Sequence, residues 1–547
     1  MAQDTHNLDA AREALIAIGD RATSDWLILT DGQPEVGIVL AADGAIALTC
    51  GGLLQDSRTA PRSLAQVELT RALPEGYASE ASLFGLGSPA LTELLLEKTG
   101  KLTALEPAAS VARAFLGLRD HSFDIRSGKL RLISPWSFAN GIVAPLSPLA
   151  VVHQASRRRD PAMCRAFTDL VRGRLAKGPA SDEPVRLLIV PPFSGGTLSM
   201  AGFLAKAADE LGSMGKLVVW PMELAVEAES LRARPTTACV RGESSEAPEL
   251  AVPPRPAGFF RKCATSLAGQ AADFRPHLIL ALAQAPLDES GVETLKDACP
   301  DACVAFWFVE DFQRFTYVRG IAAAWDLFLH IQGRFMDRTL RDWGVRKAAY
   351  LPPCADADFF KPREAPAHYK AQVSFMGAAY PNRLRILGDL DRTLGLAGLT
   401  ADNFKIFGSG WEAAGPGLKA RLFDGGRRMT AEETALVYAG GEVNLNIHSG
   451  PGEGFDPGSG FVNPRTFELA ATGAFQLCDP RPLMEGLFSN EEIAVVPSPE
   501  DLPEFVLDWL ARPTDRARAG AAARIRTLAA HLYRHRLEAA FRIAFGT

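Results

Sequence analysis

The stretch Gly460-Phe-Val-Asn-Pro-Arg-Thr-Phe-Glu-Leu-Ala-Ala-Thr-Gly473 places Arg465 three residues before Glu468, at the start of a run of small residues. The run predicts a helix, and Phe475-Gln-Leu-Cys478 predicts the next buried strand. A loop that enters a helix exposes backbone N–H groups that favour a phosphate, and Arg465 adds a bidentate donor. Glu468 can accept hydrogen bonds from sugar hydroxyls, so the stretch predicts a pocket for a nucleoside diphosphate. The alternative is a capping carboxylate beside a solvated arginine.

Three further strand-like segments precede this stretch: Val373-Ser-Phe-Met-Gly377, Lys405-Ile-Phe-Gly-Ser-Gly-Trp411 and Glu442-Val-Asn-Leu-Asn-Ile-His448. The first is followed by Pro381-Asn-Arg383 and a helix-like run. We expect the diphosphate to be bound by Arg383, Arg465 and backbone amides near Gly377 and Thr466. Asn382 is expected to fix the loop. His448 borders the predicted donor loop, although a satisfied strand-end histidine is the alternative.

In this order the segments resemble the C-terminal domain of GT-B glycosyltransferases, and more closely the spore-maturation CgeB-like branch of the group-1 glycosyltransferases. The stretches Val304-Ala-Phe-Trp-Phe-Val-Glu-Asp311, Trp325-Asp326 and Tyr350-Leu-Pro-Pro-Cys-Ala-Asp-Ala-Asp-Phe-Phe-Lys-Pro362 fit the same branch. The resemblance covers about residues 185–547 and implies two doubly wound domains that bind a nucleotide sugar. Retaining relatives carry two glutamates eight positions apart, but here Gly460 lies eight positions before Glu468. Glu453 is the candidate for the missing carboxylate.

The acceptor side is expected in the first of these two domains. A buried strand at residues 185–190 leads to Gly195 and Gly196, which have no side chain to prevent close approach of a ligand. Glu310 and Asp311 follow a very apolar strand, and a carboxylate in that position can deprotonate an acceptor hydroxyl. The alternative for both acids is a helix cap.

The chemistry predicted here requires no metal ion. A departing diphosphate gathers negative charge, which arginines and a helix N-terminus can neutralise in place of a metal. An Asp-x-Asp pair occurs at Asp356 and Asp358, but it falls in the Leu-Pro-Pro stretch, where a solvated turn explains it better. We therefore expect no metal site and no required cofactor other than the nucleotide-sugar donor.

Residues 1–180 have a different pattern. Strand-like runs separated by Asp31-Gly32 and Asp43-Gly44 predict a small antiparallel meander. A strand, a glycine turn with Gly85 and Gly87, a helix and a strand ending in Glu106 then resemble a class I methyltransferase-like unit. We expect a folded spacer without chemistry; a working S-adenosylmethionine-dependent methyltransferase is the alternative.

Composition limits the remaining possibilities. The chain has 547 residues, of which 47% are hydrophobic and 22% charged, and a net charge of −6. A net negative charge argues against a general nucleic-acid binder. No apolar run reaches the ~20 residues that are needed to cross a bilayer. The N-terminus has no basic region followed by an apolar core, so no secretory signal is expected. The eight cysteines are scattered, as in a reduced, cytoplasmic protein.

The predicted fold class is therefore α/β: a GT-B type pair of doubly wound Rossmann-like domains plus an additional N-terminal α/β domain. Expected boundaries are 1–180, 181–362 for the acceptor domain and 363–547 for the donor domain, with a proline-bearing linker at 175–184. The predicted function is that of a hexosyltransferase-like, metal-independent glycosyltransferase acting on a glycan, protein or lipid-linked acceptor. The alternative is an inactive nucleotide-sugar-binding protein of the same fold.

Overall fold

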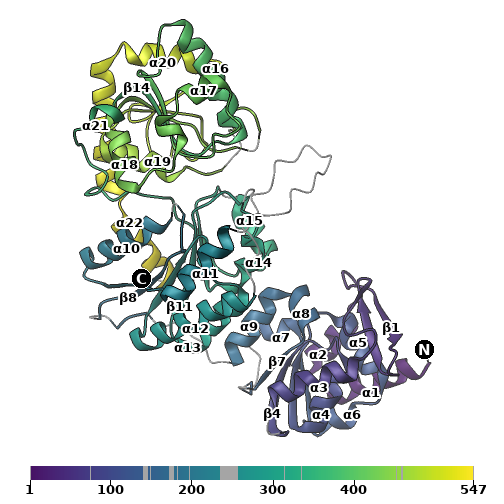
Figure 1. Cartoon of the computed structure of the whole chain (residues 1–547). Coiled ribbons are helices and arrows are strands. Elements are labelled where there is room, and N and C mark those ends of the chain that lie inside the picture. The colour runs from purple at the N-terminus through teal and green to yellow at the C-terminus, as the bar shows by residue number, and fades with distance from the viewer. Residues whose placement is uncertain are drawn as a thin grey trace. The chain divides into compact units, whose positions relative to one another are not determined.

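The computed structural model (Figure 1) describes residues 2–73, 76–139, 146–147, 149–171, 178–180, 183–195, 197–233, 257–312, 315–333, 335–450, 452–456 and 460–545. The chain divides into two compact units, Met1–Leu175 and Ala176–Thr547. None of the helices in these described ranges is both long and apolar enough to cross a membrane.

The first unit combines a meander with a parallel sheet. The meander is antiparallel, with strands β1 (Val36–Leu40), β2 (Ile46–Cys50) and β3 (Leu53–Leu54). The parallel sheet has the order β6 (Leu130–Ile133), β5 (Thr99–Leu105), β4 (Ala78–Phe84), β7 (Ala150–Val152). Its helices are α1 (Ala2–Ala17), α2 (Arg21–Trp26), α3 (Pro61–Ala72), α4 (Pro89–Lys98), α5 (Ala109–Leu118), α6 (Ser122–Arg126), α7 (Pro135–Ala139), α8 (Gln154–Arg159) and α9 (Pro161–Val171). The additional N-terminal α/β unit and the hairpin across Asp43-Gly44 are confirmed. The strand predicted before Asp31-Gly32 is wrong, because this run ends helix α2, and the third strand of the meander is β3.

The second unit begins with a six-stranded parallel sheet, which we call the first sheet. Its order is β13 (Ala348–Tyr350), β12 (Leu327–His330), β11 (Cys303–Phe308), β10 (Leu278–Leu282), β8 (Arg186–Val190), β9 (Met214–Leu217). Strands β10 and β11 are buried at every position, as expected for a parallel sheet covered on both faces. Its helices are α10 (Leu198–Glu210), α11 (Met222–Ala233), α12 (Ala257–Phe274), α13 (Glu289–Ala298), α14 (Val318–Ile321) and α15 (Phe335–Asp342), with a short helix η1 (Ala322–Ala324).

A five-stranded parallel sheet, the second sheet, completes the unit. Its order is β15 (Phe404–Phe407), β14 (Ala371–Met376), β16 (Gly441–Asn446), β17 (Gln476–Cys478), β18 (Ala494–Val495). Its helices are α16 (Pro381–Leu396), α17 (Pro416–Ala420), α18 (Ala431–Gly440), α19 (Pro464–Thr472), α20 (Leu502–Leu510) and α21 (Pro513–Ala530), with short helices η2 (Ala367–Tyr369) and η3 (Phe423–Gly426). The predicted boundary at residue 362 falls between the two sheets. The predicted α/β fold class, with a pair of parallel doubly wound sheets, is confirmed.

The last helix, α22 (Tyr533–Phe545), returns to the first sheet. Tyr533, Leu537 and Ala540 belong to the hydrophobic core around that sheet, and Figure 1 shows α22 beside α10. The C-terminal helix therefore crosses from the second sheet back to the first. In both sheets the strand order reverses beside the first strand, between β8 and β10 and between β14 and β16. Ligands of open α/β sheets bind outside the carboxyl ends of the strands at such points.

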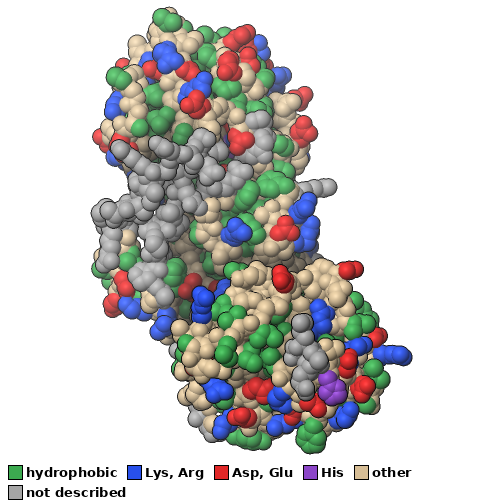
Figure 2. All heavy atoms as spheres, turned by 90° about the vertical axis from the view of Figure 1, so that its right-hand side faces the viewer, with side chains coloured by type: hydrophobic (Ala, Val, Ile, Leu, Met, Phe, Trp, Pro, Cys, Tyr) green, Lys and Arg blue, Asp and Glu red, His purple; other side chains and the backbone are tan. Residues whose placement is uncertain are grey.

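Charges on the surface are mixed. On the face drawn in Figure 2, basic and acidic side chains are interspersed over the described parts of the surface. This pattern fits a chain with 58 basic and 64 acidic residues.

One charge is buried inside the first sheet's helical layer. The Lys296 side chain of α13 is 0% exposed, and its Nζ lies 2.9 Å from Asp326 Oδ1. The other carboxylate oxygen of Asp326 accepts the backbone N–H of Val304 at 2.9 Å. The ion pair thus ties α13 to the start of β11 and the loop before β12.

We expect Lys296→Ala to destabilise the protein by about 3 kcal/mol, because the substitution leaves a carboxylate without its cation in the interior. The matched control is Lys262→Ala, since Lys262 is 60% exposed in its pair with Glu227 and should change stability by less than about 1 kcal/mol. Urea denaturation of both variants measures the difference. Equal midpoints for the two variants would contradict a structural role for the buried pair.

Candidate functional site

A cavity of about 680 Å³ opens in the second unit at the carboxyl ends of its strands. One wall belongs to the second sheet and its helices, the other to the start of α10. The lining residues are Gly195, Leu198, Ser199, Phe360, Met376, Gly377, Ala378, Gly408, Ser409, Arg428, Met429, Thr430, Ala431, Thr434 and Glu468. We call the first wall the donor wall and the second the acceptor wall.

Glu468 lies in the donor wall and is held by a tyrosine. Its Oε2 accepts a hydrogen bond from the hydroxyl of Tyr438 at 3.0 Å. Burial raises the pKa of Glu468 to about 7, although this hydrogen bond and the nearby Arg465 act in the opposite direction. The cap of α19 is Asn463, whose side chain accepts the N–H of Thr466, so Glu468 is not the capping carboxylate of this helix.

Arg465 reaches from α19 to the end of β14. Its guanidinium stacks over the Phe375 ring at 5.2 Å, and a Cβ on Gly377 would lie 2.7 Å from Nη2. The Nε and Nη1 atoms are buried and have no hydrogen-bond partner among the described residues. Buried guanidinium nitrogens without a hydrogen-bond partner favour an anion as ligand.

Arg383, which was predicted to bind the diphosphate, donates to loop carbonyls instead, and Asn382, which was expected to fix the loop, also bonds to a loop carbonyl. Arg383 is 5% exposed and donates from Nε to Ile447 O at 3.0 Å and from Nη1 to Ala378 O at 3.0 Å. Asn382 donates to the backbone carbonyl of His448 at 2.8 Å. The two residues therefore hold the loops after β14 and β16, and the guanidinium of Arg383 donates hydrogen bonds to backbone carbonyl groups.

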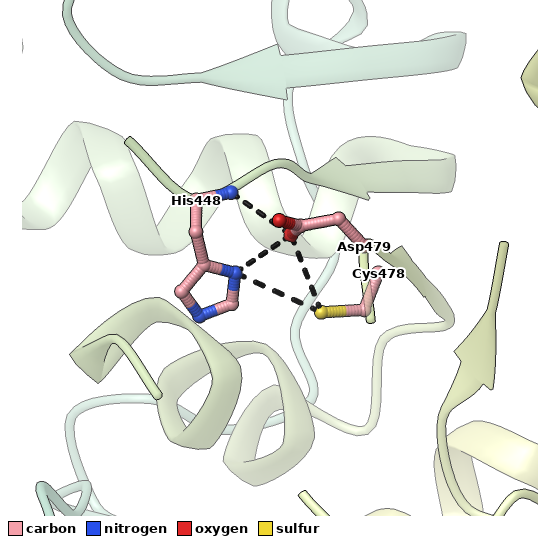
Figure 3. A group of neighbouring side chains, drawn as sticks. All are labelled: His448, Cys478 and Asp479. Carbon is pink, nitrogen blue, oxygen red and sulfur yellow. Dashed lines mark hydrogen bonds and ion pairs between the residues drawn. The ribbon is translucent and has the colours of Figure 1, made fainter. Parts of the chain in front are cut away.

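His448 fixes the start of α19 (Figure 3). Its Nδ1 lies 2.7 Å from Asp479 Oδ1, and its Nε2 accepts the backbone N–H of Asn463 at 3.0 Å. Burial, and next the charge of Arg481, lower the pKa of His448 to about 4. The imidazole is therefore neutral near pH 7 and carries its proton on Nδ1. The Thr466 N–H, which we expected near the diphosphate, donates to Asn463 Oδ1 at 3.0 Å.

Figure 3 also shows that ligand atoms of His448, Cys478 and Asp479 cluster, all within 4.8 Å of one another. Such a group could hold a metal ion by distance alone. However, Arg481 forms an ion pair with the Asp479 carboxylate, and Nδ1 of His448 already bonds to that carboxylate. The donor set fits a hydrogen-bonded brace better than a cation site.

The structure does not bring Glu453 to the cavity. Its side chain is 73% exposed and pairs with Arg385 on the surface. The position of the missing glutamate is also closed, because a Cβ on Gly460 would lie 2.5 Å from Phe335 Cε1 and 3.0 Å from Gly333 N. The close approach follows from an antiparallel bridge between Gln332 and Phe461. A carboxylate at position 460 would have to displace this contact.

Of the other predicted residues, Gly195 belongs to the acceptor wall, and Glu310 and Asp311 are not among the residues that line the cavity. Gly195 has a φ of 115° and lines the cavity, whereas Gly196 lies outside the described residues. Glu310 follows β11 and accepts hydrogen bonds from Gln284 and Tyr317. Asp311 is 6% exposed, and its carbonyl accepts the N–H of Phe315 at 3.0 Å.

Sequence reasoning missed the start of α18. Arg428, Met429, Thr430 and Ala431 line the cavity, and Thr430 and Glu433 form a capping box at this helix N-terminus. The Thr-x-x-Glu spacing is visible in the sequence and marks a helix start. It gave no indication that the start faces a ligand pocket, since the neighbouring wall comes from distant segments.

In the first unit, side chains of helix α8 and of the residue before it occupy the space at the glycine turn that was predicted to bind a nucleoside. Side chains of Ser156 and His153 lie where a Cβ on Gly85 would be, and His153 Cε1 lies 2.5 Å from a Cβ on Gly87. Glu106 accepts the N–H groups of Leu86 and Ala108 at 2.7 and 2.9 Å. It also pairs with Arg159 of α8. This closed geometry supports a folded spacer.

Much of the donor wall lies in a region of the chain that matches a known protein family. Residues 383–542 match a family described as glycosyl transferase-like. The C-terminal part of the chain is therefore similar to a glycosyltransferase domain. The matched range includes Arg465, Glu468 and the start of α18. No curated protein sequence matches the chain, and the CgeB-like branch and the methyltransferase-like unit stay predictions.

Among solved structures, the chain is similar to a sucrose-phosphate synthase of Thermosynechococcus elongatus, with 13% identity, a TM-score of 0.43, and coverage of 65% of this chain and 98% of that one. It is similar to Anabaena HepE in complex with UDP and glucose, with 9% identity, a TM-score of 0.43, and coverage of 65% and 99%. It is also similar to an α,α-trehalose-phosphate synthase of Burkholderia vietnamiensis, with 13% identity, a TM-score of 0.41, and coverage of 66% and 98%.

We expect stability to depend on pH through Glu468. Its pKa of about 7 in the folded protein lies above the usual value for a glutamate, so the folded state binds this proton more tightly and loses stability as pH rises toward 7. Glu468→Gln has no such proton to lose. Relative to wild type, the variant should gain roughly 1–3 kcal/mol between pH 5 and pH 8, measured by urea denaturation at both values. A relative loss over this interval would mean that the charged carboxylate stabilises the fold.

Proposed function

We propose that this protein is a glycosyltransferase that takes a sugar from a nucleotide-activated donor and transfers it to a hydroxyl acceptor. The supporting observation is that Glu468 lines a cavity at the carboxyl ends of two parallel sheets, and that Arg465, on the same helix, lies against the cavity-lining Gly377. Both residues lie within the glycosyltransferase-like domain. A donor of the hexose class, in the GT-B arrangement of two facing domains, is part of the proposal.

In this function Arg465 binds the diphosphate and Glu468 the ribose hydroxyls. The free Nε and Nη1 atoms of Arg465 can donate to two phosphate oxygens, which is the geometry that guanidinium groups favour. One carboxylate oxygen of Glu468 accepts the hydrogen bond of Tyr438, which leaves the other oxygen to accept one from a hydroxyl of the ligand. The closely packed Gly377 lets the donor approach the end of β14 without a side chain between them.

The same wall favours departure of the diphosphate. As the bond to the sugar breaks, negative charge grows on the leaving oxygens, and donors held in place stabilise it without reorganisation. Arg465 supplies one positive charge. The N-terminus of α18 faces the cavity at Thr430 and Ala431, and the helix dipole adds positive potential there. Transfer without a metal ion is part of this proposal.

A second candidate is a binding protein that keeps the fold but lacks transfer activity. The observation in its favour is Gly460, where retaining relatives carry a glutamate, in a position that packing keeps closed. The two functions differ in one readout. A transferase releases nucleoside diphosphate from a nucleotide sugar, in the presence of acceptor or slowly by hydrolysis, whereas a binding protein returns the donor intact.

The first test is a thermal-shift screen of the purified protein against UDP, GDP, ADP and their glucose and mannose derivatives. A ligand that binds the folded state raises the melting temperature by mass action. Chromatography of the incubated mixture then detects release of the diphosphate. Absence of a shift with every nucleotide would refute both the transferase and the binding protein.

We expect Arg465→Ala to weaken nucleoside diphosphate binding by about 1.5–3 kcal/mol, the scale of a charge-assisted hydrogen bond. Binding of the bare nucleoside should hardly change, because it lacks the phosphates. The matched control is Arg385→Ala, since Arg385 is 57% exposed and pairs with Glu453 on the surface. Isothermal titration with UDP and with uridine, or with the nucleotide that the screen selects, measures both variants. Equal affinities of Arg465→Ala and wild type would remove Arg465 from the site.

We also expect the donor site to be independent of the first unit. The first unit ends at Leu175, and the described residues that line the cavity all belong to the second unit. A truncated protein that begins at Ala180 should bind the selected nucleotide within about threefold of the full chain, because no lining residue is removed. Circular dichroism verifies that the truncated protein is folded. A folded truncated protein without nucleotide affinity would show that the first unit contributes to binding.

A further inference from the structure

Strand β1 forms an open edge of the meander in the first unit. The strand order β1-β2-β3 gives β1 one neighbour, β2, and leaves its other side without a strand among the described residues. Figure 1 shows β1 at the outer rim of this unit. An edge of this kind presents backbone N–H and C=O groups that can pair with a strand of another chain.

The register of the meander fixes which backbone groups face outward. At the turn between β1 and β2, the N–H of Ala41 donates to the carbonyl of Ala45 at 2.8 Å. Hydrogen-bonded positions alternate along an antiparallel pair, so the odd-numbered residues of β1 bond to β2. The N–H and C=O groups of Val36, Ile38 and Leu40 therefore point away from β2, toward the open edge.

The side chains at two of these positions are apolar and largely uncovered. Ile38 is 54% exposed and Leu40 is 73% exposed. Ile38 lies opposite Leu48 of β2, which is 0% exposed, so both side chains are on the core-facing side of the meander. The apolar face of the meander thus extends beyond its core at the β1 edge.

A second group of exposed apolar residues borders the same helix as β1. Ile28 and Leu29 are each 52% exposed. Arg113 of α5 donates to the carbonyl of Leu29 at 2.6 Å, and α5 also packs against β1. Exposed apolar residues that gather in one region mark an interaction surface.

Strand β1 lacks the features that protect edge strands. Its sequence, Val36-Gly-Ile-Val-Leu40, contains no charged residue and no proline, and its pairing with β2 runs without a bulge. Charges, prolines and bulges are the usual means by which proteins prevent pairing between edges. The opposite edge of the meander differs, because β3 is only two residues long.

We propose that β1 pairs with β1 of a second copy of this chain, antiparallel and about a two-fold axis at Ile38. In this register Ile38 faces the partner's Ile38, and Val36 faces the partner's Leu40. Every facing pair within the strand then consists of apolar residues or glycine. Glu35 is the charge nearest to the strand and faces the partner's Ala41, so no like charges oppose each other there.

Self-complementarity favours a second copy over an unrelated strand. A two-fold interface requires one surface that fits itself, and β1 fits itself in length, polarity and charge. The pairing joins two meanders into one continuous sheet and covers Ile38 and Leu40 of both copies. The first unit, whose glycine turn is occupied by its own side chains, then serves as the dimerisation unit of the chain. This role is independent of the proposed transferase function.

The first test is a cross-link at the axis, in the full chain. Directly opposite residues of a hydrogen-bonded antiparallel pair have Cα atoms about 5.5 Å apart, within the range of a disulfide. Under mild oxidation Ile38→Cys should therefore form a dimer that a reductant separates, as seen on a non-reducing gel. The matched control is Leu40→Cys, because the two copies of position 40 lie roughly 14 Å apart along the strands. Wild type, oxidised in parallel, measures cross-linking through the native cysteines.

The second test is the oligomeric state, measured by sedimentation equilibrium. Wild type should have twice the mass of one chain. Ile38→Lys places two like charges opposite each other at the axis, so the dissociation constant should rise at least about tenfold. The matched control is Leu53→Lys on β3, since Leu53 is also 73% exposed and should leave the dimer unchanged. Circular dichroism verifies that both variants are folded.

The outcomes are decisive for this interface. A monomeric wild type at the concentration used for cross-linking refutes the proposal, as does a wild-type dimer that Ile38→Lys leaves intact. Equal cross-linking of Ile38→Cys and Leu40→Cys contradicts the register. An assembly larger than a dimer contradicts the two-fold axis, because an isologous pairing of one edge closes with two copies.

Discussion

The donor wall depends on one set of hydrogen bonds that begins at the buried carboxylate of Asp479. That carboxylate fixes the proton of His448 on Nδ1, which makes Nε2 an acceptor for the N–H of Asn463. Asn463 in turn caps α19. The direction of α19 determines where Arg465 and Glu468 lie, so these two side chains are positioned by residues that are not among those lining the cavity. A neutral buried histidine serves this purpose well, because its two nitrogens take opposite hydrogen-bonding roles.

The sequence predicted the features that are local. Arg465 and Glu468 are three residues apart on a helix, so their common side follows from helical spacing. In the structure Glu468 lines the cavity and Arg465 lies beside the cavity-lining Gly377. The alternation of strands and helices likewise predicted two parallel sheets. In each case the relevant neighbours lie within one element or one strand–helix unit, where periodicity carries the information.

The roles of other residues depended on distant partners. Arg383 bonds to Ile447, 64 positions away, and His448 bonds to Asp479, 31 positions away. Nothing in the spacing around Arg383 distinguishes an arginine that meets a phosphate from one that meets a carbonyl. The glycines of the first unit are a similar case. Gly85 and Gly87 follow the nucleoside-binding pattern, yet the chain's own α8 occupies the space that the missing side chains leave.

Gln332 joins the two walls at a single point. Its side chain holds the carbonyl of Glu310, while its backbone pairs with Phe461 in the loop that leads to α19. The glycines next to this bridge, Gly333 and Gly460, pack so closely that little sliding is possible between the two segments. A side chain at position 460 would push these two segments apart, so the spacing between the loop after β12 and the loop before α19 depends on a glycine there.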